Sequence, residues 1–349
     1  MTVARTGRPA ALALLFASAA CTANGSRVAD TPAVAGSDTS VQSAQPAAPA
    51  WWTQLSDPLL AALVRQGLEA SQEISCQIAS LRSFDEETAS DARRIGARIG
   101  RFLGDRSTAP GPAAREERVE RVALRRARLA RQIAAAYVDV RRLQQDVAIR
   151  SALRNQFRDN AEVAQFRREA GLVPALDGAL ARSQDEVAQG ELGFAQGRLE
   201  DAVGELARLV GERPEALAAR LAPPLPLTDP PVDPLAMAQA DDPRRAKLAD
   251  QILREARLGQ ALAESRRTVR DARSAYRGGA GSFATLYVAE AAANAVELAL
   301  LDARAGRIAA TLDLWAGQDR DWAREGLAPV VGTHPPATAE TITVMAACD

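Results

Sequence analysis

The chain is poor in the residue types that support metal binding, redox chemistry and catalysis. Its 349 residues contain one histidine, His334, together with three cysteines and three methionines. With one histidine the chain cannot form a pair of histidine ligands for a metal. It also contains no C-x-x-C, G-x-S-x-G or P-loop motif. A catalytic site would have to rest on the scattered carboxylates that any charged helical surface carries. The sequence therefore predicts a protein that is not an enzyme and holds no cofactor or metal.

Net charge and aromatic side chains are also scarce. The 43 basic and 44 acidic residues nearly cancel, so the whole chain offers no field that would gather nucleic acid. The arginines of segment 115–131 alternate with acidic residues and lack aromatic neighbours, which is typical of a solvated helix face. We therefore expect no nucleic-acid partner. With only 7 Phe, 3 Tyr and 4 Trp against abundant Ala, Leu, Arg and Glu, the composition predicts an all-α fold of long helices.

Residues 1–20 have the pattern of a secretory signal peptide. Arg5 and Arg8 precede an apolar run that is too short to span a bilayer. Cys21 follows S-A-A, which resembles a bacterial lipobox and implies lipidation of Cys21, but Ser18 departs from the usual aliphatic residue and leaves ordinary A-x-A cleavage as the alternative. Residues 21–50 are rich in small and polar residues and are predicted to be a flexible tether. Because Thr22 is not aspartate, we expect an outer-membrane lipoprotein that faces the periplasm.

Two further cysteines could pair in an oxidising compartment. Cys76 lies in a helical pattern and Cys348 lies at the extreme C-terminus, so the sequence leaves their pairing open. Neither has a histidine or a second cysteine at metal-ligand spacing, which argues against a redox or metal role.

Hydrophobic periodicity and helix breakers divide the rest of the chain into two helical hairpins. Asp57 and Pro58 suit the N-cap and first position of a helix that follows the anchors Trp51 and Trp52. Long helices are predicted from about residue 114 to 171, then to about 210, and again over 243–276 and 283–315, with apolar residues at coiled-coil spacing. The predicted units are a first helical repeat at 51–220, a proline-rich connector at 221–242, a second helical repeat at 243–322 and a tail at 323–349.

The two hairpins share a sequence pattern at their turns. "FRREAGLVPALDGALA", 166–181, matches "YRGGAGSFATLYVAEA", 276–291, without a gap at an offset of 110 residues, and "LARLVG" matches "LDLWAG" at an offset of 106. Self-similarity of this kind predicts that both hairpins descend from one duplicated unit.

Several of these segments, in this order, resemble the TolC and OprM type of outer-membrane efflux protein. "WWTQLSDPLLAALVRQGLEAS" is similar to the start of these proteins, "RQIAAAYVDVRRLQ" to the first long helix, and "LARLVGERPEAL" to the end of their first repeat. The two turns resemble their periplasmic turns, written Y-R-x-G-x-x-S-[YF]-x-x-x-L-x-A in the usual form. The family pattern sets Gly279 opposite Gly171, whereas the self-match sets Gly281 there, and the sequence leaves this register open.

The resemblance implies a homotrimer whose hairpins form a hollow α-barrel across the periplasm. The turns would dock on a periplasmic adaptor protein that works with an inner-membrane pump, and substrates would pass without chemistry. The residues carried over to the docking turns are Arg167, Gly171, Leu172, Tyr276, Arg277, Gly279 and Ser282. The alternative to a docking role is that the glycines have only a structural one, since they let the backbone take positive φ between antiparallel helices.

The sequence also departs from this family. Segment 81–113 lacks the alternation of a membrane strand, and the second repeat has no room for a strand pair, so we expect both transmembrane hairpins to be absent. Only Thr341–Met345 has a strand pattern. The helix that ends at Tyr276 is also shorter than its counterpart in the first repeat. Two functions stay open, an efflux component or a pore-less periplasmic helical lipoprotein that acts as a scaffold.

Overall fold

The computed structural model describes residues 50–93, 111–171, 175–222, 225–231, 242–318 and 320–329. These residues form helices and connecting segments without a strand, which confirms the all-α fold. The predictions for the signal peptide, Cys21, the tether, Leu172, His334, the strand Thr341–Met345 and Cys348 lie outside the described residues. The elements in chain order are η1 (Trp51–Leu55), α1 (Pro58–Ala70), α2 (Gln72–Arg93), α4 (Pro112–Glu169), α5 (Ala175–Val210), α6 (Pro214–Leu221), α7 (Pro243–Arg277), α8 (Phe283–Gln318) and η3 (Asp321–Arg324).

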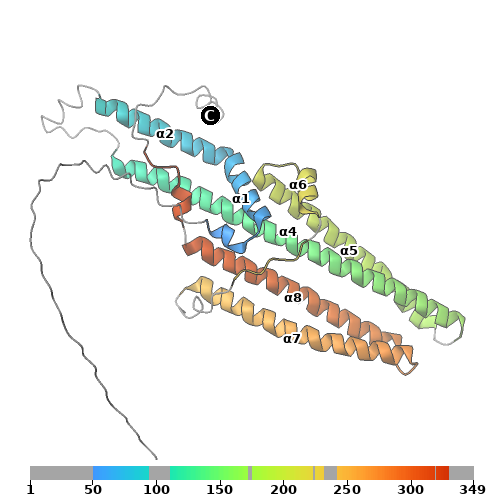
Figure 1. Cartoon of the computed structure of the whole chain (residues 1–349). Coiled ribbons are helices and arrows are strands. Elements are labelled where there is room, and N and C mark those ends of the chain that lie inside the picture. The colour runs from blue at the N-terminus through green and yellow to red at the C-terminus, as the bar shows by residue number, and fades with distance from the viewer. Residues whose placement is uncertain are drawn as a thin grey trace, which may run out of the picture. The chain divides into compact units, whose positions relative to one another are not determined.

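Four long helices form two antiparallel hairpins, as predicted. Helix α4 packs against α5, α7 packs against α8, and the hairpins join where α4 contacts α8 (Figure 1). The central pair is therefore α4 and α8, while α5 and α7 lie at the two edges. The hairpins have unequal arms, because α4 has 58 residues and α7 has 35. Helix α7 runs without interruption from Pro243 to Arg277, so the second repeat contains no inserted strand pair.

The long helices meet along the apolar seams that the sequence predicts. Ile133 and Val140 of α4 and Leu206 and Val210 of α5 are fully buried in the main core. Because this core also takes in Ile308 of α8, both hairpins contribute to one hydrophobic cluster. Burying such aliphatic side chains contributes about 1.5–3 kcal/mol each, which a single exposed helix could not gain.

A buried polar junction holds the first helix of the chain onto α4. Asp57 caps α1 by accepting hydrogen bonds from the amides of Leu59 and Leu60, at 3.0 and 3.1 Å. Its second carboxylate oxygen accepts the Tyr137 hydroxyl at 2.6 Å. Burial, followed by this hydrogen bond to a carboxylate, raises the pKa of Tyr137 to about 12. Arg141, which is 2% exposed, donates to the Tyr137 hydroxyl and to the Leu221 carbonyl, so the junction extends to the end of α6.

The predicted tryptophan anchors are buried, and they join the first and last described elements. Trp51 and Trp52 are 1% and 5% exposed and meet edge to face. Trp52 also meets Trp322 of η3, with ring centroids 4.5 Å apart. Cys76 of α2 is disulfide-bonded, and the other two cysteines of the chain are outside the described residues.

Helix α8 is apolar enough to resemble a membrane span by length and composition alone. Its most apolar window has a mean hydropathy of 1.3, and it is the one such helix in the described part of the chain. The helix nevertheless packs on α4 and α7 and carries two buried charged residues, Glu290 and Arg307. These contacts indicate a packed helix of the bundle.

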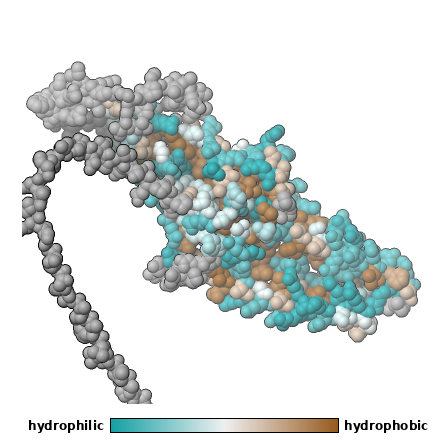
Figure 2. All heavy atoms as spheres, viewed as in Figure 1, coloured by the Kyte–Doolittle hydropathy of each residue, from teal (hydrophilic) through white to brown (hydrophobic). Residues whose placement is uncertain are grey.

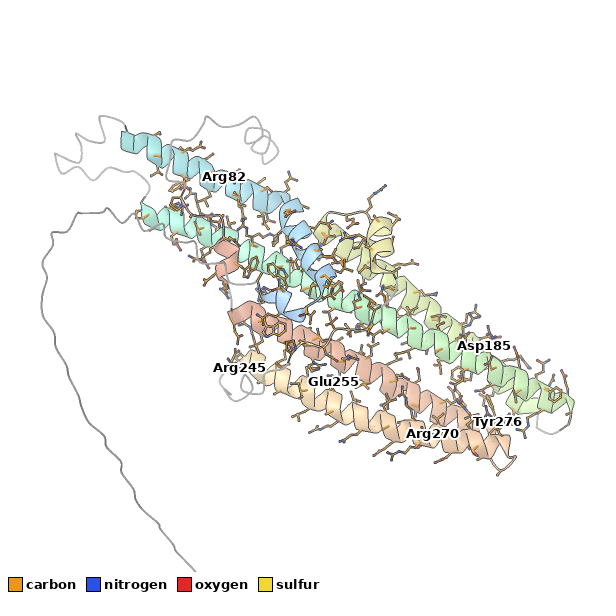
Figure 3. The ribbon with its side chains drawn as sticks, in the orientation of Figure 1. Arg82, Asp185, Arg245, Glu255, Arg270 and Tyr276 are labelled. Carbon is orange, nitrogen blue, oxygen red and sulfur yellow. The ribbon has the colours of Figure 1, made fainter. Side chains whose placement is uncertain are left out.

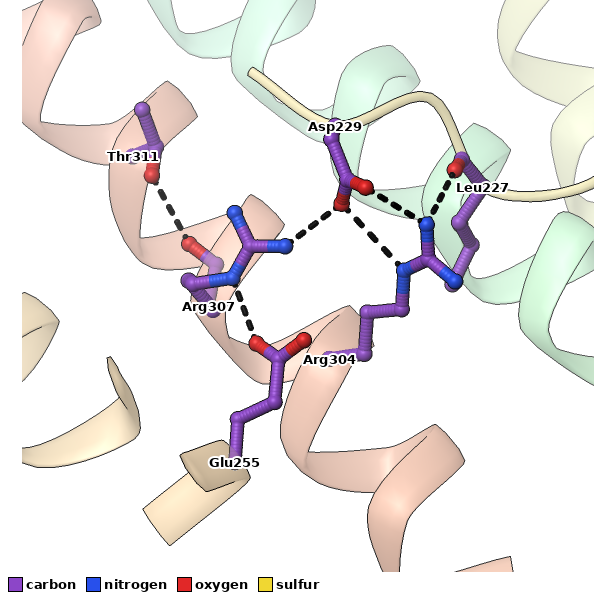
Figure 4. A network of polar contacts seen from close by, with 6 residues as sticks. All are labelled: Leu227, Asp229, Glu255, Arg304, Arg307 and Thr311. Atoms are coloured by element: carbon purple, nitrogen blue, oxygen red, sulfur yellow. Dashed lines mark hydrogen bonds and ion pairs between the residues drawn. The ribbon is translucent and has the colours of Figure 1, made fainter. Parts of the chain in front are cut away.

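Residues 225–231 of the connector are held on the second hairpin by a cluster of ion pairs (Figure 4). Asp229 accepts hydrogen bonds from Arg304 at 2.7 Å and from Arg307 at 2.5 Å. Arg307 also donates to Glu255 of α7, and Leu227 of the connector is buried in the main core. Partial burial alone would raise the pKa of Asp229, but the hydrogen bonds and charges of Arg307 and Arg304 outweigh it and lower that pKa below its usual value.

This shift predicts an acid-sensitive contribution of Asp229 to stability. Because the folded state favours the carboxylate, the contribution is complete above the unfolded-state pKa of about 3.9 and is lost as the pH falls below about 4. The contribution is at most about 1 kcal/mol, because the Asp229 side chain is 55% exposed and water screens it. Urea unfolding should show that Asp229→Asn lowers stability at pH 7 and that the difference from wild type shrinks as the pH falls from 4 towards 3. Asp201→Asn, at an exposed position without an ion pair among the described residues, should match wild type at both pH values.

Glycine permits a close approach of α1 to the first hairpin at Gly67. A Cβ atom at this position would lie 2.4 Å from Cδ1 of Ile133 and 3.0 Å from the Leu209 carbonyl oxygen. We expect Gly67→Ala to lower the free energy of unfolding by about 1–3 kcal/mol through overpacking. Gly259→Ala on α7, where a Cβ would meet nothing within 4 Å, should raise it by up to about 1 kcal/mol. Equal effects of the two substitutions in chemical denaturation would contradict this packing.

Candidate functional site

The candidate site is the pair of turns at which each hairpin reverses. Gly171 after α4 and Gly279 after α7 both have positive φ, at 72° and 76°. The amide of Gly171 donates to the Arg168 carbonyl, and the amide of Gly279 donates to the Tyr276 carbonyl. These bonds are those of a helix C-terminus closed by glycine in the left-handed conformation, which other residues adopt only at a cost.

The geometry settles the register between the two turns. The two glycines with positive φ are 108 residues apart, and so are the starts of α5 and α8, which both have 36 residues. Gly279, rather than Gly281, is therefore the counterpart of Gly171. The structural offset of 108 residues lies midway between the offsets of the two sequence matches, 110 and 106 residues.

Arg167 brings the two turns into contact. Its guanidinium lies 4.8 Å from the centre of the Tyr276 ring, and its Nη1 donates to the Tyr276 carbonyl oxygen at 3.1 Å. The cation–π contact and the charged hydrogen bond both cross from α4 to α7. Two of the predicted docking residues, from distant parts of the sequence, are thus partners of each other.

Tyr276 is buried at the junction of the four long helices (Figure 3). It is 4% exposed and packs edge to face on Phe283, with ring centroids 5.9 Å apart. Ala164 of α4 and Ala181 of α5 belong to the same cluster. The Tyr276 hydroxyl has no hydrogen-bond partner among the described residues, although burying a hydroxyl without one costs free energy.

The remaining predicted residues have other surroundings. Ser282 caps α8, since its hydroxyl accepts the Thr285 amide at 3.1 Å. Arg277 is exposed and has no ion pair within the described ranges. Leu172 is outside those ranges. The turns therefore combine an inner contact, formed by Arg167 and Tyr276, with an exposed cation at Arg277.

A buried carboxylate that the sequence analysis did not single out supports this site. Glu290 of α8 is 3% exposed, and it accepts hydrogen bonds from Asn160 of α4 at 2.9 Å and from Arg273 of α7 at 2.8 Å. It thereby ties the two hairpins together about two helix turns further from the reversals. Its signal in the sequence is a lone acid in the small, apolar run "VAEAAANA".

The arrangement offers contacts rather than chemistry. No cluster of three or more His, Cys, Asp or Glu side chains that could hold a metal occurs among the residues that the structure describes. Two polar side chains at the turns have structural roles: Arg167 holds helices together and Ser282 caps α8. The site is suited to holding, or releasing, the relative position of two hairpins.

Arg167→Gln should loosen the contact between the hairpins. Losing the cation–π contact and the charged hydrogen bond should cost about 1–3 kcal/mol of stability and speed hydrogen exchange in the last turn of α7. Mass spectrometry of peptides that contain Tyr276 would measure this exchange. Arg277→Gln, in the same turn but without a partner among the described residues, serves as the control and should leave exchange unchanged. Identical exchange in the two variants would rule out the Arg167 link.

The matches to known proteins come from the comparison of structures. No family model matches this chain, and no curated protein matches its sequence. Among solved structures, the outer-membrane channel OprN matches with a TM-score of 0.61 and 16% identity over 76% of this chain and 91% of its own. VceC, an outer membrane protein of Vibrio cholerae, matches with a TM-score of 0.57 and 14% identity over 76% and 97%.

A third solved structure agrees with these two. CusC, which forms a transmembrane channel, matches with a TM-score of 0.54 and 14% identity over 78% of this chain and 94% of its own. At this level of identity the likeness concerns the fold alone. The TolC-like fold that the sequence predicts is confirmed.

Proposed function

We propose that the protein is one protomer of a conduit in the bacterial cell envelope, acting as the outer-membrane component of a tripartite efflux or secretion system. The observation that carries this proposal is the arrangement of two hairpins with adjoining turns, which is the fold of outer-membrane channels. Small molecules or drugs would pass through it without chemistry. Lipidation of Cys21 would tether the protomer to the outer membrane, with its helices in the periplasm.

Charge on the two edge helices supports assembly with further copies of the chain. Helix α7 carries ten basic and four acidic residues, whereas α5 carries three basic and seven acidic residues. Opposite charge would therefore favour contact between α7 of one protomer and α5 of the next. Because this contact joins different surfaces, it is heterologous and can close into a ring. The family resemblance implies a ring of three copies.

The outward face of α5 also supports a helix partner from outside the chain. A Cβ atom at Gly190, Gly193, Gly197 or Gly204 would meet nothing within 4 Å, so packing within one chain does not require glycine there. Each glycine in a helix costs about 1 kcal/mol relative to alanine. On the same helix Val187 and Phe194 are 52% and 71% exposed. Glycine would allow the backbone of a neighbouring protomer's helix to approach closely.

The turns would dock on a periplasmic adaptor protein that connects the conduit to an inner-membrane pump. Near the turns, Phe166 and Val288 are 71% and 63% exposed, and Arg277 adds an exposed cation. On the face shown in Figure 2, hydrophobic patches of this kind lie among hydrophilic side chains. Arg167 and Tyr276 would act from within, by setting the position of the turns that carry this surface.

The continuity of α7 favours a second candidate function. An uninterrupted helix from Pro243 to Arg277 leaves the second repeat without a strand pair. A ring of such protomers could act as a pore-less periplasmic lipoprotein, a scaffold or accessory of an envelope complex. This candidate shares the fold and the assembly of the first and differs in conductance.

Conductance in planar bilayers separates the two functions. We expect the purified, full-length, lipidated oligomer to produce discrete current steps, because a hollow ring passes ions. The Cys21→Ala variant, assembled in detergent, tests whether the anchor is needed for insertion. A stable oligomer that never conducts would replace the conduit with the scaffold.

Assembly itself can be tested at Gly197. We expect Gly197→Trp to shift the oligomer to monomers, because a large side chain would block close approach at the edge of α5. Native mass spectrometry measures the oligomeric state, and circular dichroism should show unchanged helix content, since the substituted position is open within one chain. Arg158→Trp, at an exposed position of α4, is the control for added bulk. Oligomers that persist with Gly197→Trp would exclude α5 as the interface.

A further inference from the structure

A hollow on the seam between the two central helices is separate from the turns. It has a volume of about 330 Å³ and is lined by residues of η1, α4 and α8. Small-molecule sites usually begin at about this size. Its lining residues are Trp51, Arg128, Arg131, Gln132, Ala134, Ala135, Ala309, Leu312 and Asp313.

The floor of this hollow is apolar. Its apolar lining consists of Ala134 and Ala135 of α4, Ala309 and Leu312 of α8, and Trp51 of η1. Short alanine side chains leave space that leucine or phenylalanine would fill. An apolar segment of a ligand would thus find a surface already free of polar groups.

The rim of the hollow carries an excess of positive charge. Arg128 is exposed and has no ion pair with any described residue. Arg131 lies 3.7 Å from Asp313, and Arg244 lies 3.6 Å from the same carboxylate, so one acid is shared by two arginines. Both distances exceed hydrogen-bond length, which leaves the donors of these guanidinium groups available. The rim therefore has cationic donors in excess of its acceptors.

We propose that this hollow binds an anionic single-chain amphiphile, with its carboxylate at Arg128 and Arg131 and its alkyl chain along the alanine floor. The site goes beyond the proposed conduit function, because it lies away from the turns and needs no pore. Arg128, Gln132 and Ala135 follow one another at helical spacing, so the arginine and the floor lie along one face of α4. Arginine suits this role because its planar group can donate two parallel hydrogen bonds to a carboxylate.

Isothermal titration of the full-length protein with dodecanoate, below its micelle concentration, tests the proposal. We expect one binding site per chain, weaker binding as salt rises, and no comparable binding of dodecyltrimethylammonium. Acetate, which has the same head group without the chain, should bind far more weakly. Equal affinity for the cationic and anionic amphiphiles, or no binding of dodecanoate, would overturn the assignment.

Two exposed positions on α4 locate the site. Arg128→Gln should weaken dodecanoate binding about tenfold, the loss expected for one charged hydrogen-bond partner. Ala135→Glu should abolish it by placing a carboxylate over the floor. Arg158→Gln and Ala148→Glu are matched changes at exposed positions elsewhere on α4 and should bind as wild type does. Unchanged binding in Arg128→Gln and Ala135→Glu would place the ligand elsewhere and refute the proposal, and circular dichroism verifies that each variant is folded.

Discussion

The structure depends on one constraint, the need of a 58-residue helix to cover its apolar surface. An isolated amphipathic helix gains little in water, so α4 is stable only through the elements packed around it. It contacts α1, α2, α5, α8 and η3, and it is the element through which the first hairpin contacts the second. The partners of α4 change along its length, because α7 and α8 of the second hairpin are shorter than α4 and cannot cover it as far as its first residue. Helix α2 and η3 cover the part of α4 near Val119 and Val122.

Buried polar groups determine how the elements around α4 are aligned. The Tyr137 hydroxyl donates to Asp57 and accepts from Arg141, which also donates to the Leu221 carbonyl. Together these bonds fix the start of α1 and the end of α6 on α4. Glu290 has the same function near the turns, where it receives donors from both hairpins. Removing one member of such a network would leave a buried charge without a partner, which costs more than the network contributes to net stability.

The bounds of the long helices could be predicted because proline and glycine mark them. Pro112, Pro243, Gly171 and Gly279 stand within one or two residues of helix ends, and the apolar spacing between them is regular. The break between α1 and α2 was not predicted, since Ser71 interrupts the helix without a glycine or proline and the apolar spacing continues across it. The short helix α6 was also missed.

The contacts of the candidate site were beyond prediction for a different reason. Arg167 and Tyr276 were each selected from turn motifs, but their contact joins residues 109 positions apart and depends on how two hairpins pack. The pairing of Glu290 with Asn160 spans 130 positions and leaves no local pattern. The register of the turns was ambiguous because "GGAG" offers several glycines, and only backbone φ distinguishes them.

The contact between Trp52 and Trp322 has a consequence for the integrity of the fold. This contact joins η1, the first described element, to η3, the last one. A single proteolytic cut between these tryptophans would yield two fragments that remain associated through the same indole rings and the core beneath them. The fold is therefore suited to tolerate a nick in either turn, because both turns lie between the two tryptophans in the sequence.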